Sequence, residues 1–393
     1  MYLSKVLKVL YSPRKTLREV IQNPKYIGPL LIMILFLAAS VASEYVYFSK
    51  YYSEQLIPNG TNATILDEWT QNSSFWTSPN ANITESSDAI NGTIYGNASI
   101  AFSAQNSSQV STNLTGIGTV NCSAPNSFDL LSFRTKWTNP QAQLENVTIQ
   151  MFSLNSSSDY FSSDLTDTFS NATYDTWNNI TLQLDSPTWN ASNSNADWGG
   201  ITGLQLNFTW ATNSSNSNVM LLIDGLFFHG PFESFLETAG SSYLVDYGIS
   251  VIFLFVITWV LFAGLIYALA KAFKGKITWR PLFIAVGFAL MTMFVQSLLV
   301  GIAYSTLPTI RVPFELLGGV QGEGTSALNT ISNQTWLVSL FSELVLPIVI
   351  WMWTSALGSI IVRAITGFSR GKSIVIAIIA YSIVFFLTFL GII

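Results

Sequence analysis

Few residues in this chain have the types and spacing that chemistry requires. There is one cysteine, Cys122, and one histidine, His229. These counts exclude a disulfide framework within the chain. They also leave too few residues for a histidine-based metal centre or for Cys-His or Ser-His catalysis. The one clear ionisable residue inside an apolar stretch is Glu343. A carboxylate within a membrane span is by default a candidate site; the alternative is a protonated or interfacial glutamate without a role of its own.

The sequence also narrows the function classes. No nucleophile motif or Gly-rich phosphate loop is visible, so we expect a protein that is not an enzyme, although scattered Asp and Glu leave a glycosidase-like carboxylate pair open. Residues 49–235 hold 15 acidic residues but only Lys50, Arg134 and Lys136 as basic ones. We expect no nucleic-acid partner, because phosphate binding needs cationic surface. Few lysines with abundant Ser, Thr and Asn favour an archaeal cell-envelope protein.

The most frequent signal is the Asn-x-Ser/Thr sequon, which marks exported, exposed surface. The chain has 17 sequons, sixteen of them within 49–235. A segment rich in Asn, Ser and Thr contains sequons by chance, which is the alternative explanation for their number. Chance does not explain the position of Asn333, which lies outside this segment in a loop that the distribution of Lys and Arg, described below, also places outside the cell. The expected glycosylation sites are Asn59, Asn62, Asn72, Asn82, Asn91, Asn97, Asn106, Asn113, Asn121, Asn146, Asn155, Asn171, Asn179, Asn190, Asn207, Asn213 and Asn333.

Five apolar segments without Lys or Arg are long enough to cross a bilayer, which takes roughly 20 residues for about 30 Å of hydrocarbon. They are 27–48, 247–270, 281–305, 336–362 and 373–393. The first has small residues at Ala39–Ala42 that are typical of a signal-peptide cleavage site. The basic segment in front of it is too long for an ordinary signal peptide, so we expect a retained transmembrane helix.

Basic residues set the expected topology, because short cytoplasmic loops are enriched in Lys and Arg. Of the 17 basic residues, 13 lie in 1–29, 271–280 and 363–372, which five spans place on one side. We therefore expect a multi-pass protein of the cell membrane with a cytoplasmic N-terminus. The predicted parts are a cytoplasmic amphipathic segment (1–26), the first span (27–48), a glycosylated extracellular domain (49–235) and four further spans (236–393).

The polar region has the pattern of a β-sandwich. Short alternating runs are separated by turn residues, as expected for strands, and seven tryptophans argue against disorder. These tryptophans fit a core, with an exposed sugar-stacking platform as the alternative. The runs are Ser99–Phe102, Val147–Met151, Ile180–Leu184, Leu204–Phe208 and Met220–Asp224. We predict an all-β jelly roll joined to a five-helix transmembrane bundle.

Three segments of this region, Trp177–Leu182, Ala196–Leu204 and Leu222–Phe228, resemble carbohydrate-binding-module jelly rolls. The resemblance implies a glycan-binding fold. It also implies that Asp224, which matches the acidic residue of the last strand in that family, helps to hold a structural calcium ion. Hard cations prefer oxygen ligands, and an ordinary acidic residue in a strand-end turn is the alternative. No other cofactor is expected.

The remaining resemblance lies in the membrane part. Ser12 can cap a helix that has Pro13 at its first position, and Pro24 ends it. This Pro-bounded helix, rich in Lys and Arg and followed by five spans, resembles the Yip (Ypt/Rab-interacting) family. We expect contacts with membrane lipid and with other membrane or envelope proteins, and a role as an accessory or structural subunit with a glycan- or protein-binding outer domain. The alternative is a transporter or channel component with a pathway through Glu343.

Overall fold

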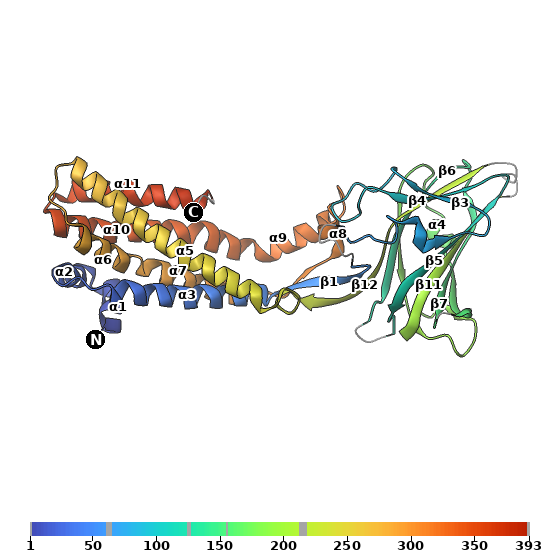
Figure 1. Cartoon of the computed structure of the whole chain (residues 1–393), viewed down its shortest axis with the longest axis horizontal. Coiled ribbons are helices and arrows are strands. Elements are labelled where there is room, and N and C mark those ends of the chain that lie inside the picture. Colours follow the sequence, from blue (N-terminus) through green and yellow to red (C-terminus); the bar gives the residue numbers. More distant parts are fainter. Residues whose placement is uncertain (1, 60–64, 124–126, 155, 212–217, 391–393) are drawn as a thin grey trace. The chain divides into compact units, whose positions relative to one another are not determined.

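The computed structural model describes residues 2–59, 65–123, 127–154, 156–211 and 218–390 (Figure 1). The chain forms two compact units. The helical unit comprises Met1–Tyr52, Ser234–Ile310 and Thr330–Ile393, and the sandwich unit comprises Ser53–Glu233 and Arg311–Asn329. The division differs from the sequence-based one at one point, because Arg311–Asn329 belongs with the strands although it lies between two membrane-type helices in the sequence.

Among the described residues, five helices or helix pairs are long and apolar enough to span a membrane: Ile27–Phe48, Ser242–Ala272, Trp279–Ser305, Thr325–Thr366 and Arg370–Thr388. This confirms the predicted set of five. The helices of this unit are α1 (Tyr2–Tyr11), α2 (Pro13–Gln22), α3 (Ile27–Phe48), α5 (Phe235–Ala272), α6 (Trp279–Ala289), α7 (Met291–Ser305), α9 (Thr325–Ser339), the π-helical turn η4 (Leu340–Val345), α10 (Leu346–Thr366) and α11 (Arg370–Phe389).

Figure 1 shows the long helices running side by side, with α3 packed on α7 and α5, and α10 packed on α11. Small residues permit the closest approach, which is how helices associate in lipid. A Cβ added at Gly301 of α7 would lie 2.7 Å from Ser43 Oγ of α3. At the same contact, the Ser43 hydroxyl donates to the Ser297 carbonyl at 2.9 Å.

The N-terminal segment forms two helices, of which only α2 was expected. Pro13 stands in its first turn and Ser12 at its N-cap, as predicted, but the Ser12 side chain makes no capping hydrogen bond. The Thr16 hydroxyl instead donates to the Ser12 carbonyl at 2.9 Å. Leu17 and Val20 are buried on the apolar face of α2, so the helix is amphipathic as its spacing indicated.

The sandwich unit consists of two sheets. Among the described residues, one sheet has seven strands, with the path β13-β1-β12-β4-β3 and β6 pairing with β12 and β9, and the other has six in the order β10-β8-β7-β11-β5-β2. The strands are β1 (Tyr51–Ile57), β2 (Trp76–Thr77), β3 (Asn82–Ser86), β4 (Ser99–Ala104), β5 (Gln109–Val120), β6 (Leu130–Asn139), β7 (Leu144–Ser153), β8 (Ser156–Asp164), β9 (Asn178–Gln183), β10 (Asn190–Ala191), β11 (Ile201–Trp210), β12 (Val219–Ser234) and β13 (Ile310–Val312).

Side-chain alternation along the strands separates the core from the outer faces. On β11, Leu204, Leu206 and Phe208 are fully buried, whereas Gln205 and Asn207 point to the opposite face and are half-buried. Six of the seven tryptophans belong to this core or pack against it, with Trp137 and Trp210 fully buried, and Trp177 packs against a second apolar cluster. The alternative interpretation, in which exposed tryptophans form a sugar-stacking platform, is therefore wrong. These rings instead pack in the interior of the sandwich unit.

Candidate functional site

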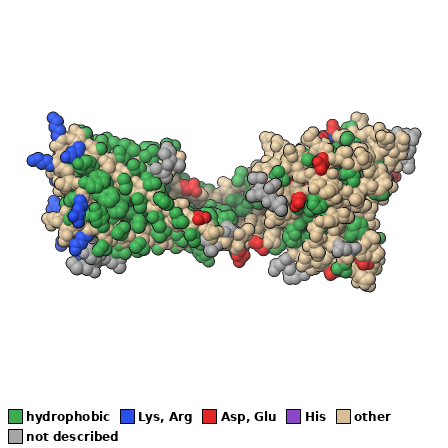
Figure 2. Space-filling model, viewed as in Figure 1, with side chains coloured by type: hydrophobic (Ala, Val, Ile, Leu, Met, Phe, Trp, Pro, Cys, Tyr) green, Lys and Arg blue, Asp and Glu red, His purple; other side chains and the backbone are tan. Residues whose placement is uncertain are grey.

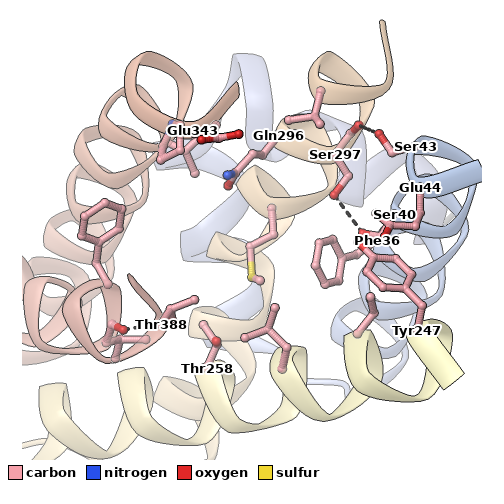
Figure 3. A pocket seen from close by; sticks show the side chains of 18 of the residues that line it. Phe36, Ser40, Ser43, Glu44, Tyr247, Thr258, Gln296, Ser297, Glu343 and Thr388 are labelled. Carbon is pink, nitrogen blue, oxygen red and sulfur yellow. Dashed lines mark hydrogen bonds between the residues drawn. The ribbon is translucent and has the colours of Figure 1, made fainter. Parts of the chain in front are cut away.

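The helical unit has a partly open cavity of about 350 Å³ between α3, α5, α7, α10 and α11. Most of its wall is apolar, but several polar groups converge on it, as Figure 3 shows. Glu343 and Gln296 extend into one part of the cavity, while Ser40, Ser43 and Glu44 approach from α3. Glu343 therefore lines this cavity, and its role as an intramembrane polar site stays a prediction.

Glu343 reaches this space through a local change in helix geometry. Pro347 has no N–H group and its ring crowds the carbonyl four residues earlier, so an ordinary α-helical turn is disfavoured at this point. The helix instead contains the π-helical turn η4 at this point, in which the Leu346 N–H donates a hydrogen bond to the Phe341 carbonyl, five residues earlier. Such wide turns inside α-helices are frequent at functional sites.

The two carboxylates of the cavity differ in their partners. The Tyr243 hydroxyl donates to Glu44 Oε1 at 2.7 Å, and nearby the Ser40 and Ser297 hydroxyls lie 2.9 Å apart. Within the part of the chain that the structure describes, no side chain hydrogen-bonds to the Glu343 carboxylate. The described lining also holds no Lys, Arg or His. Such a lining suits a proton or another cation and opposes an anion.

Glu44 is a site residue that sequence reasoning missed. In the sequence it stands near the end of the first span, where a charge costs little. The structure instead places it in the wall of the cavity, because α3 packs against α7 and α5 along its length. Its spacing from Ser40, four residues earlier on the same helix face, was the available signal.

In the sandwich unit, Asp224 lies against a second carboxyl group, Asp67, and both are fully buried. The Thr70 hydroxyl and the Gly225 N–H both donate to this pair, the latter to Asp67 Oδ2 at 2.9 Å. The Ile90 N–H donates to Asp224 Oδ2 at 2.7 Å. Burial, outweighing these hydrogen bonds, raises the pKa of Asp224 to about 6. Burial and the neighbouring Asp224 charge raise the pKa of Asp67 well above its ordinary value.

The surroundings of Asp224 bear on the predicted calcium ion. N–H groups of Ile90 and Gly225 and the Thr70 hydroxyl all reach its oxygens. Such donors occupy the positions that a cation would take, and calcium requires six to eight oxygen ligands. Among the described residues, no group of three or more His, Cys, Asp or Glu could hold a metal ion. The described geometry fits a carboxyl pair that shares a proton better than a metal site, and calcium at Asp224 stays a prediction.

A second buried polar cluster joins three strands. His229 Nε2 lies 2.6 Å from Ser132 Oγ, and His229 Nδ1 lies 3.0 Å from Glu54 Oε1. This is the order of groups in a serine-hydrolase triad, which the sequence had given no reason to expect. Ser132 and His229 are each only 6% exposed. The other Glu54 oxygen accepts the Phe314 N–H at 2.8 Å. The cluster therefore ties β1, β6 and β12 to the segment Arg311–Asn329.

The outer face of the six-stranded sheet carries a groove of about 430 Å³. The register of the strands places its polar residues side by side, because Gln205 of β11 stands opposite Asn113 of β5 and Gln150 of β7. Gly203 leaves its floor open, since a Cβ there would lie 2.6 Å from the Leu114 carbonyl. The described residues that line the groove are all uncharged: Thr77, Asn113, Thr115, Gly116, Phe152, Ser156, Ser157, Thr202, Gly203 and Gln205.

The predicted glycosylation sites are mostly accessible. The exposed ones are Asn59, Asn72, Asn82, Asn91, Asn97, Asn106, Asn121, Asn146, Asn171, Asn179, Asn190 and Asn333. Asn113 and Asn207 are half-buried on the outer sheet face. Asn207 Oδ1 accepts the Ser111 hydroxyl at 2.6 Å, so this side chain is already engaged. Asn62, Asn155 and Asn213 lie outside the described residues. Exposure permits modification, and the sites stay predictions.

Fold and site together define a multi-pass membrane protein that carries a β-sandwich. Residues 203–392 match the family model described as the Yip1 domain, which confirms the resemblance seen in the sequence. The match begins within β11 and continues through α11. Among curated proteins, no sequence relative matches.

Several solved structures are similar to part of this chain. The family 30 carbohydrate-binding module of a cellulosomal cellulase from Clostridium thermocellum is 12% identical, with 44% of this chain and 96% of that chain covered and a TM-score of 0.28. An exo-beta-agarase is 14% identical, with 43% and 25% covered and a TM-score of 0.30. This chain therefore spans about a quarter of the agarase's length. These likenesses concern the fold alone.

Proposed function

We propose that this chain is a non-enzymatic membrane protein of the cell surface, an accessory subunit of an envelope assembly whose sandwich binds a neutral glycan. The observation that carries the proposal is the groove on the outer face of β5, β11 and β7. Its charge-free lining of amides and hydroxyls matches the hydroxyl groups of a neutral sugar. Phe152 adds an apolar ring that can cover one face of a pyranose, as aromatic side chains do in sugar sites.

Glycosylation of the protein itself limits where a ligand can bind. A glycan on Asn113 would fill the groove, because this residue lines it. Asn113 is only partly exposed within the long strand β5, and Asn207 of the neighbouring strand is held by hydrogen bonds. Sequons in paired strands are poorer acceptors than those in exposed loops. The proposal therefore requires that Asn113 carries no glycan, which leaves the groove open to an external sugar.

The test uses the full chain in lipid nanodiscs and a panel of neutral and anionic oligosaccharides. We expect binding of neutral members, weakened about tenfold by Gln205→Ala or Phe152→Ala, since each removes roughly 1–1.5 kcal/mol of contact. The matched control is Ser162→Ala on β8, which stands opposite Gln150 on the same sheet face and lies outside the groove. Equal binding by all variants, or preference for a protein partner over every sugar, would refute the glycan assignment.

The cavity around Glu343 favours a second function, passage of a proton or small cation through the helical unit. Two carboxylates from different helices line one cavity without a basic neighbour among its described residues. Glu343 stands in a π-helical turn, a geometry that is frequent at functional sites. Reconstituted in liposomes, the wild type would then move protons or cations and Glu343→Gln would not. Absence of transport in both leaves the binding function alone.

A further inference from the structure

The helical unit has a cleft lined by four arginines at one end of the spans. Arg14 and Arg18 come from α2, Arg363 from the last turn of α10 and Arg370 from the first turn of α11. The cleft holds about 730 Å³. Figure 2 shows Lys and Arg side chains gathered at this end of the unit, beyond the apolar surface of the helices.

Local structure brings the four side chains together. Arg14 and Arg18 are four residues apart on α2 and so share a helix face, and α2 packs against α10. Gly367 ends α10 in a left-handed conformation, with φ of 70°. This turn reverses the chain within a few residues, so Arg370 begins α11 close to Arg363. None of the four guanidinium groups has a carboxylate within 4 Å among the described residues.

The positive charge of this cleft favours a ligand with several negative charges. The three basic segments of the chain, 1–29, 271–280 and 363–372, contain a single acidic residue, Glu19. Four like charges around one space repel each other, and a ligand with several negative charges relieves that repulsion. Guanidinium groups bind phosphate oxygens in pairs. The N-terminus of α11, at Ser369 and Arg370, carries the positive end of the helix dipole and favours the same charge.

We propose that the cleft binds the headgroup of a membrane phospholipid with at least two negative charges. The cleft lies where the apolar helices α10 and α11 end, which is the depth of lipid phosphates. Ile360, Phe368 and Ile374 add apolar wall beside the arginines, and these fit the glycerol and upper acyl chain. A free phosphate compound would use the charges but leave this apolar wall uncovered. Basic pockets between spans are typical sites for such headgroups.

The experiment measures lipid binding to the purified full chain in detergent by native mass spectrometry. Cardiolipin, phosphatidylglycerol and phosphatidylcholine are titrated, and cardiolipin is expected to bind most tightly. Replacing one arginine from each side of the cleft (Arg14→Gln with Arg363→Gln) should weaken cardiolipin binding about 30-fold, from two lost charge contacts. The matched control, Lys271→Gln with Lys276→Gln, removes the same charge from exposed positions outside the cleft and should leave binding unchanged.

Three outcomes would overturn the proposal. Equal losses in the cleft variant and the lysine control would show attraction to the basic surface as a whole. Equal affinity for phosphatidylcholine and cardiolipin would exclude a charge-selective site. Full displacement of cardiolipin by soluble pyrophosphate would assign the cleft to a phosphate compound from the aqueous phase. Tryptophan fluorescence of both double variants must match the wild type, which is expected because the four arginines are exposed.

Discussion

The buried pair Asp67 and Asp224 makes the stability of the sandwich unit depend on pH in an unusual direction. Burial raises the pKa of Asp224 from 3.8 to about 6. Because the folded-state pKa lies above the unfolded one, the folded chain holds the proton more tightly. The stabilisation is fully present below about pH 4 and is lost as the pH rises through about 6. Most paired carboxylates have the opposite effect.

The size of this effect follows from the pKa. Each unit corresponds to about 1.4 kcal/mol, so ionisation of Asp224 lowers the free energy of unfolding by about 3 kcal/mol between acid and neutral pH. The raised pKa of Asp67 acts in the same direction. In Asp67→Asn an amide replaces the protonated carboxyl group. This variant should therefore match the wild type in acid and be more stable at neutral pH, with a flatter profile.

Cys122 provides the assay, since it is the single cysteine of the chain and is fully buried in the sandwich. A pyridyl disulfide, which also reacts with thiols in acid, reaches it only when the unit opens. Dividing its rate by that of a free thiol gives the opening constant. This constant should rise about a hundredfold from pH 4 to pH 7, and Asp167→Asn, at an exposed carboxylate, should behave as the wild type. A constant that falls with pH, or an Asp67→Asn variant destabilised at neutral pH, would refute the reasoning.

Three further outcomes are expected. Excess chelator should leave the melting temperature of the sandwich unchanged, whereas a fall would establish the calcium ion predicted at Asp224. His229→Leu should lower the free energy of unfolding by about 2–4 kcal/mol in denaturant titrations, because Glu54 and Ser132 lose buried partners; a change too small to resolve would contradict this. In intact cells an impermeant amine reagent should not label Lys274 or Lys276, while protease removes residues 50–235, and labelled lysines would reverse the topology.

The sequence predicted those features that depend on pattern along the chain. Apolar runs without Lys or Arg located the five spans, and period-two alternation located strands such as β7 and β11, because both signals are local. It could not predict contacts between distant segments. Glu54, Ser132 and His229 are far apart in sequence, and only the pairing of β12 with β6 brings two of them together. Likewise Asp67 has no sequence signal that connects it with Asp224.

The segment Arg311–Asn329 was the hardest to place, because its neighbours in the sequence are membrane-type helices. Side chains of this segment hold it to the strands by pairing with residues that are far away in the sequence, and the sequence does not show which residues pair. Glu323 pairs with Arg134, whose guanidinium is buried and lies 4.5 Å from the centre of the Tyr95 ring. Phe314 packs beside Tyr95 and Phe227. A buried arginine without its carboxylate is strongly destabilising, by about 3–5 kcal/mol.

This arrangement shows how the Yip1 match relates to the sandwich. The matched residues 203–392 include not only four of the five spans but also most of β11, all of β12 and the anchored segment Arg311–Asn329. β11 is central to one sheet and β12 to the other. The region that carries the family match therefore supplies central strands of both sheets. It also supplies Glu323, the partner of Arg134. The sandwich is therefore built mainly from residues between the first two spans, and it is completed by Arg311–Asn329, which follows the third span.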